Sequence, residues 1–191
     1  MGAWPVAMEG DVAVDKDNDG IGLLLKHHGK VRQHLRTLRA LEAVLSGLDA
    51  DAAQEGRAQL REFIRFIDHC HPLHEQDETH SLFPRLEVAL ARQASVDAAL
   101  LADFRAVKDE HEDFVRLWEP VREAMWVLST PDAILSRDRW REAVATLCGH
   151  FEGHFAREEA RLFPAAAALL SAEETAAVAA EIRQRHASVA P

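Results

Sequence analysis

The chain has 191 residues, enough for one domain with a sizeable core, and helix-forming residues such as Ala, Leu, Glu and Arg dominate it. Its formal net charge is −10, from 22 Lys and Arg against 32 Asp and Glu. An acidic surface repels phosphate backbones, so we predict no nucleic-acid partner. No stretch approaches 18 consecutive apolar residues, so we predict no membrane segment. Tyrosine is absent, which excludes a tyrosyl radical, whereas histidine, the commonest metal ligand, occurs 11 times.

Apolar residues recur at the helical period along most of the chain and predict five helical segments. They cover residues 23–48, 52–90, 96–128, 138–170 and a short stretch from 171 onward. Ser171 to Glu174 has the form of a capping box that opens the last helix. Pro84 and Pro164 are expected to interrupt their helices. Short links suit antiparallel neighbours, so we predict an all-α, up-down four-helix bundle with a short extra C-terminal helix.

We divide the chain into an N-terminal loop segment (1–20), the bundle (21–170) and a C-terminal helix packed on it (171–191). Cys70 and Cys148 do not make a disulfide framework. The N-terminal residues lack the basic start and apolar run of a secretory signal. A cytoplasmic location is therefore expected, with the protein a monomer or a homodimer.

An eleven-residue motif occurs twice, at the same relative place in each half of the chain. His74, Glu78 and a Leu-Phe-Pro ending at Pro84 recur 80 positions later as His154, Glu158 and a Leu-Phe-Pro ending at Pro164. A His and a Glu four residues apart lie on one face of a helix, one turn apart. Each motif can therefore direct an imidazole and a carboxylate at the same metal site.

The first and third helices each offer a histidine to complete this site. His111 shares the apolar face of the third helix with Val107 and Phe114. His28 is preferred on the first helix, because apolar residues stand at −4, +3, +7 and +10 from it, as they do from His111. His27 and His34 remain alternatives to His28.

These motifs resemble those of the hemerythrin family, specifically its HHE cation-binding branch, over about residues 21–170. The resemblance implies two iron ions, bridged by an oxo or hydroxo group, although zinc or manganese also suits such ligands. It implies these metal ligands: His28, His74, Glu78, His111, His154 and Glu158. If both irons are octahedral, the donors of these residues and the bridge leave about two coordination positions open for a ligand.

Two departures from the oxygen-carrying hemerythrins matter for function. The carriers have another histidine one turn after the third-helix ligand, where this chain has Val115, and an Asp at the position of Glu159. A role as a reversible oxygen carrier is thus disfavoured. His150, one turn before His154, is an open candidate for a fifth imidazole, and its counterpart Cys70 is expected to be inert.

The remaining histidines and acidic residues lack motif support. His69 and His71 are expected at the surface, and Glu75 and Glu159 are expected to face solvent. A histidine without a motif is more often a satisfied structural residue than a ligand.

Three functions follow as alternatives. The first is a non-enzymatic di-iron protein that binds O2, NO or iron, for sensing, buffering or storage. The second is an enzyme that acts on peroxide or NO, or supplies iron for iron–sulfur repair, and for this no separate catalytic residue is identified. The third is a zinc-bound or metal-free interaction module.

Overall fold

The computed structural model describes residues 19–45, 50–130 and 137–188, and those residues are helical apart from short connections. Two π-helical turns, η1 and η2, interrupt the α-helices. In chain order the elements are α1 (Gly20–Leu45), α2 (Ala50–Asp77), η1 (Glu78–Leu82), α3 (Phe83–Ala91), α4 (Ala98–Leu128), α5 (Arg137–Arg157), η2 (Glu158–Leu162), α6 (Phe163–Leu169) and α7 (Ala172–Ala187).

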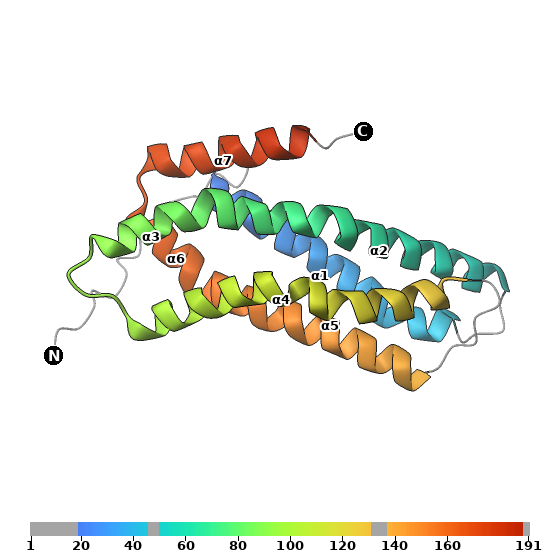
Figure 1. Ribbon diagram of the computed structural model, residues 1–191. Coiled ribbons are helices and arrows are strands. Elements are labelled where there is room, and N and C mark those ends of the chain that lie inside the picture. Colours follow the sequence, from blue (N-terminus) through green and yellow to red (C-terminus); the bar gives the residue numbers. More distant parts are fainter. Residues whose placement is uncertain (1–18, 46–49, 131–136, 189–191) are drawn as a thin grey trace, which may run out of the picture.

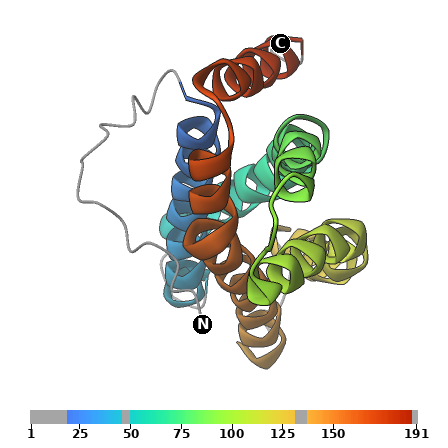
Figure 2. The ribbon, with the colours of Figure 1, turned by 90° about the vertical axis from the view of Figure 1, so that its left-hand side faces the viewer.

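Four long rods pack side by side in an up-down arrangement, and α7 lies outside them (Figure 1). The rods are α1, the continuous run α2–η1–α3, then α4, and the continuous run α5–η2–α6. Seen from one end, the four rods surround a common axis and α7 stands apart from it (Figure 2). The predicted all-α bundle with an extra C-terminal helix is confirmed. None of the described helices has both the length and the apolar composition needed to cross a membrane.

The two Leu-Phe-Pro sequences do not interrupt their rods, contrary to the prediction from Pro84 and Pro164. Instead, the turn before each proline widens, so that the Phe83 N–H donates to the carbonyl of Glu78, and that of Phe163 to Glu158. The wider turn relieves the clash of the proline ring with the preceding turn. Each proline then lies in the first turn of the next α-helix, where its missing N–H is not needed. The π-turns begin at the two motif glutamates, and such turns are frequent at functional sites.

Two clusters of apolar side chains fill the bundle. The long core occupies the half containing Leu38, Leu60 and Trp118. The short core occupies the half containing Leu24, Phe83 and Phe163. Between them lies a band of polar side chains that are 0 to 2% exposed: His28, His71, His74, Asp77, Glu78, His154 and Glu158. Burying polar groups costs folding free energy, and such exceptions are expected at functional sites, so this band is a candidate functional site.

Helix α7 is attached to the bundle by packing and by a buried acid. Its capping box is present, with Ser171 Oγ accepting from the Glu174 N–H at 3.2 Å and Glu174 accepting from the Ser171 N–H at 2.8 Å. On the bundle side, Asp77 pairs with Arg185 and accepts from His186 Nε2 at 2.7 Å. The proposed division at residues 20 and 170 stays a prediction, and residues 1–18 lie outside the described ranges.

Candidate metal centre

All six sequence-predicted ligands come together, each rod contributing at least one: five belong to the polar band, and His111 joins them from α4. Helix α1 supplies His28, α4 supplies His111, and each motif supplies a histidine and the glutamate that opens the following π-turn. Their donor atoms form two groups that share both glutamates. The first group is His28, His74, Glu78 and Glu158; the second is Glu78, His111, His154 and Glu158.

In the first group, two imidazoles and two carboxylate oxygens converge. His28 Nε2 is 3.1 Å from His74 Nε2 and 3.2 Å from Glu158 Oε2. His74 Nε2 is 3.5 Å from Glu78 Oε1. Donors bonded to one ion at about 2.0–2.2 Å are separated by distances of this size.

The second group uses the opposite oxygen of each glutamate. His111 Nε2 is 3.2 Å from His154 Nε2 and 3.3 Å from Glu78 Oε2. His154 Nε2 is 3.3 Å from Glu158 Oε1. Each carboxylate thus has one oxygen in each group, which is the arrangement that lets it bridge two ions.

The hydrogen bonding of these residues is incomplete in a way that a cation would resolve. Both oxygens of Glu78 and of Glu158 are buried without a hydrogen-bond partner. Buried carboxylates without partners are strongly disfavoured unless they are neutralised or coordinate a metal. The chemistry of the donors and their orphaned oxygens therefore fit a two-metal centre.

The pKa values of these groups are shifted by their burial and by their charges on one another, which no cation offsets. Desolvation, followed by the neighbouring His27 and His28 charges, lowers the pKa of His74 well below 6.5. Desolvation and the charge of Glu158 raise the pKa of Glu78 well above 4.5. Burial would lower the pKa of His154, but the facing Glu158 carboxylate overcomes it and raises that pKa to about 9. Metal binding would replace these protons, so affinity should increase with pH.

A family comparison agrees with this geometry. The model of the Hemerythrin HHE cation binding domain matches residues 19–125 and 102–190, two stretches that overlap on α4. The chain belongs to the hemerythrin HHE cation-binding family. No curated protein and no solved structure matches it. The family and the buried His/Glu groups together make this a metal-binding protein.

The second ring nitrogen of three of the four candidate ligand histidines lies against a polar side chain. His28 Nδ1 lies 2.8 Å from Glu159 Oε1, and His111 Nδ1 lies 3.3 Å from the hydroxyl of Thr79, 80 positions before Glu159. These partners fix ring orientation, as outer contacts commonly do around metal-binding histidines.

The other two rings differ, because His154 has such a partner whereas the Nδ1 of His74 is buried without one. His154 Nδ1 lies 2.9 Å from Glu110 Oε2, while the ring of His74 stacks on that of His27 with centroids 4.1 Å apart. His27 and Glu110 directly precede His28 and His111. Each donor group therefore holds one imidazole backed by a carboxylate and one that is not.

Three sequence expectations are wrong. Glu159 does not simply face solvent: it binds His28 and forms two hydrogen bonds with Arg32, at 2.7 and 2.9 Å, and these contacts lower its pKa to about 2. Glu75 is only 18% exposed at its side chain, and desolvation raises its pKa. His71, expected at the surface, is 1% exposed because α2 turns that face toward the bundle axis.

The alternative histidines lie beside the cluster or away from it. His27 packs on His74, and His34 stacks on Phe66 at 4.1 Å. The ring of His150 stacks on that of His154 at 5.7 Å, but His150 belongs to neither donor group. Cys70 and Cys148 are free thiols, and burial raises the pKa of Cys148, which favours the inert thiol.

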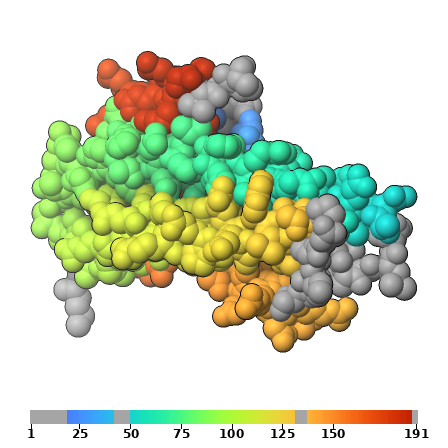
Figure 3. Space-filling model, turned by 45° about the vertical axis from the view of Figure 1, so that its right-hand side comes forward, coloured from blue at the N-terminus to red at the C-terminus, as the bar shows by residue number. Residues whose placement is uncertain are grey.

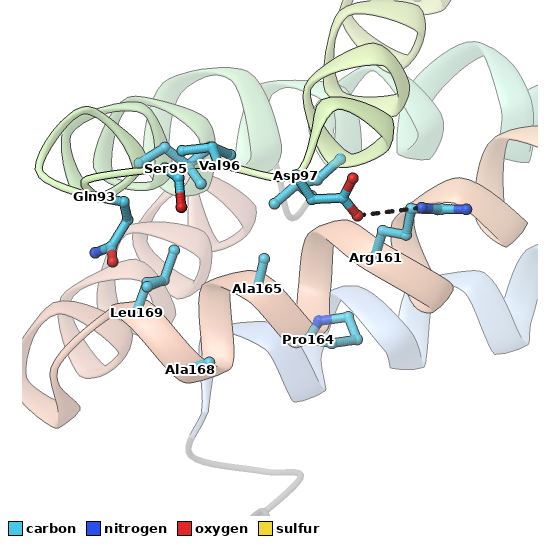
Figure 4. Close-up of a pocket in the computed structure, with 11 residues that line it drawn as sticks. Gln93, Ser95, Val96, Asp97, Arg161, Pro164, Ala165, Ala168 and Leu169 are labelled. Carbon is cyan, nitrogen blue, oxygen red and sulfur yellow. Dashed lines mark ion pairs between the residues drawn. The ribbon is translucent and has the colours of Figure 1, made fainter. Parts of the chain in front are cut away.

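An apolar pocket of about 270 Å³ lies apart from the metal centre, between the α3–α4 connection and α6 (Figure 4). Ala165, Ala168 and Leu169 form one wall, and Arg161 at the rim pairs with Asp97 at 3.7 Å. None of the six candidate ligands lines this pocket. This apolar pocket and the metal chemistry are thus separate features.

The outer carboxylates give a testable prediction. Changing Glu159 or Glu110 to Ala should weaken metal binding about 10- to 100-fold, because His28 or His154 loses the group that orients its ring. Competition with a chelator of known affinity measures the change. Glu152→Ala, which removes only a pair between exposed Arg39 and Glu152, is the control and should bind metal normally. Unchanged affinity in Glu159→Ala and Glu110→Ala would show that the contacts do not support the ligands.

Proposed function

We propose that this hemerythrin-family protein holds two iron ions between its four rods and uses them to bind a small molecule. The observation that carries the proposal is the pair of donor groups that share Glu78 and Glu158. Imidazole together with carboxylate oxygen suits iron, and bound iron would supply redox chemistry and coordination positions open to a ligand. The roles considered are sensing, buffering or storage, in which the ligand is O2, NO or iron itself.

Access to the centre supports a role in ligand binding. Among the six candidate ligands, the side chain of His111 is 9% exposed whereas the others are at most 1% exposed. His111 lies on α4 beside α2, and Figure 3 shows the face on which these two helices run side by side. A small molecule would therefore approach between α2 and α4.

The same face argues against a reversible oxygen carrier. Val115, at the position where the carriers are expected to have a further histidine, is 59% exposed and so does not point toward the cluster. The two donor groups contain two imidazoles each. We therefore favour a protein that senses, buffers or reacts over one that carries oxygen.

Metal analysis and an absorption spectrum of freshly, aerobically purified protein test the proposal. We expect about two irons per chain and near-ultraviolet charge-transfer bands. One zinc per chain without iron would overturn the iron assignment and favour the zinc-bound interaction module. Manganese in place of iron would keep the two-metal site but change its chemistry.

A further inference from the structure

The two sides of the metal centre along the bundle axis differ in polarity, and comparing the two copies of the repeat shows this. On the short-core side, the repeat places identical apolar residues: Leu82 with Leu162 and Phe83 with Phe163. All four are buried, at 3% exposed or less. None of these four side chains can hydrogen-bond to a ligand.

On the long-core side, two positions are polar in the first copy and aromatic in the second. His71 stands where the second copy has Phe151, and Glu75 where it has Phe155. Both phenylalanines are fully buried, which shows that aromatic rings fit this layer of the bundle. One half of the layer is therefore polar although its repeat counterpart is apolar.

His71 reaches the bundle axis. Its ring contacts Phe114 of α4 with centroids 4.3 Å apart, Phe151 of α5 at 4.9 Å, and His27 of α1 at 6.2 Å. Rings from three other rods thus surround it. Its Nε2 lies 3.4 Å from Glu75 Oε1, and its Nδ1 is buried without a hydrogen-bond partner. A carboxylate beside Nε2 favours the tautomer protonated there, so Nδ1 is left as an acceptor.

Glu75 follows His74 on α2, and its side chain is 18% exposed. Its buried Oε1 lies 3.4 Å from His71 Nε2, and after desolvation the charges of His111, His154 and His150 have the largest effects on its pKa. The pair therefore offers two acceptors: the Nδ1 of His71, which has no partner, and the carboxylate of Glu75. Keeping such polar groups inside the bundle is costly, and phenylalanine at both positions would avoid that cost.

We propose that His71 and Glu75 form the hydrogen-bonding wall of the ligand space, and that the ligand is protic, of the hydrogen peroxide class, rather than NO or O2. The inference rests on the two-metal centre of the proposed function, and it replaces the O2 and NO considered there with a protic ligand. Hydrogen peroxide has O–H groups to donate to the two acceptors, whereas NO and O2 have none. His71 and Glu75 are positioning residues here, and the metals are held by the six cluster residues.

The test compares three iron-loaded variants with the wild type. His71→Phe places at position 71 the residue that the repeat has at 151, Glu75→Leu removes the carboxylate, and Glu75→Gln keeps one acceptor oxygen. Three quantities are measured: irons per chain, the dissociation constant for NO from the spectrum of the reduced protein, and the rate constant for reaction with hydrogen peroxide. His34→Phe makes the same ring change where the side chain stacks on Phe66.

We expect all variants to keep two irons and to bind NO within about twofold of the wild type. His71→Phe and Glu75→Leu should each slow the peroxide reaction about tenfold, the effect of one lost hydrogen bond, while Glu75→Gln and His34→Phe stay close to the wild type. Equal changes for NO and peroxide, or no change for either, would overturn the inference. Loss of iron in Glu75→Leu would overturn it by making Glu75 a metal ligand. A wild-type protein without two metals would instead overturn the proposed function, and this inference with it.

Discussion

Replacing Glu158 with Ala should remove both metal ions, whereas replacing a histidine of one group should first weaken only that group. Glu158 offers one oxygen to His28's group and the other to His154's group. Its loss leaves each ion short of a donor and also short of negative charge inside a buried site. His74→Ala and His154→Ala should lower metal content as well, beginning with the group in which each ring lies.

Stability should fall together with metal content, because the ions join all four rods. A ligand present at about 1,000 times its dissociation constant stabilises the folded state by about 4 kcal/mol. For a chain of this size that corresponds to a fall in Tm on the order of 10 °C for Glu158→Ala. The wild type treated with a strong chelator should show the same fall, and chelator should have little effect on the variant.

Metal analysis and thermal unfolding with and without chelator measure these effects. Glu152→Ala is a suitable control, since it changes a glutamate of the same rod that is 61% exposed at its side chain. A Glu158→Ala protein that still carries two metals and unfolds at the wild-type temperature would refute the assignment of the centre.

The cluster of candidate ligands was predictable from the sequence because two signals agree. Helical spacing alone places His74 with Glu78, and the repeat then selects His154 and Glu158 from many other acidic and basic residues. The choice of His28 over His27 and His34 depended on matching the apolar neighbours of His111. The structure places His28 in the first donor group and His27 behind His74.

The surroundings of the ligands were harder to predict. Whether Glu159 or Glu75 faces solvent depends on how closely the neighbouring rod approaches, and Arg32 of α1 reaches Glu159 across that contact. Helical periodicity describes one helix and carries no information about the crossing of two. Two pairs of positions held an unused signal. Positions 79 and 159 correspond in the repeat, positions 27 and 110 directly precede His28 and His111, and all four residues contact candidate ligand rings.

The π-turns were also missed, because proline was taken only as a helix breaker. A π-turn adds a residue to its turn and rotates the chain that follows, so a side-chain pattern counted at 3.6 residues per turn loses its phase there. The apolar pairs after each motif, Leu82 with Phe83 and Leu162 with Phe163, point to the core even so.

The second large effect concerns the metal-free protein, which should become more stable when Glu78 is replaced with Met. The Glu78 carboxyl is fully buried and neither oxygen has a hydrogen-bond partner, so without metal it costs folding energy. Methionine has a similar volume and no such cost. Replacing buried charged groups with apolar ones of similar size often stabilises a protein by about 1–4 kcal/mol, which is a rise in Tm of about 3 to 10 °C here.

The gain should grow with pH. The pKa of Glu78 in the folded protein is well above its ordinary value of 4.5, because of burial and the charge of Glu158. The unfolded protein releases this proton near pH 4.5, whereas the folded protein releases it only at higher pH. The wild type therefore loses stability as the pH rises from 4.5 through the folded pKa, and Glu78→Met does not. The difference in Tm should be larger at pH 8 than at pH 5.

Thermal unfolding of chelator-treated wild type and Glu78→Met at these two pH values measures the effect. Glu62→Met, at an exposed position of the same rod, should change stability by no more than about 0.5 kcal/mol at either pH. In the presence of metal the order should reverse, since only the wild type gains binding energy. A metal-free Glu78→Met protein less stable than the wild type at pH 8 would mean that Glu78 is satisfied without a cation. In that case the buried carboxylates would be structural, and the folding cost that we attribute to Glu78 without metal would not exist.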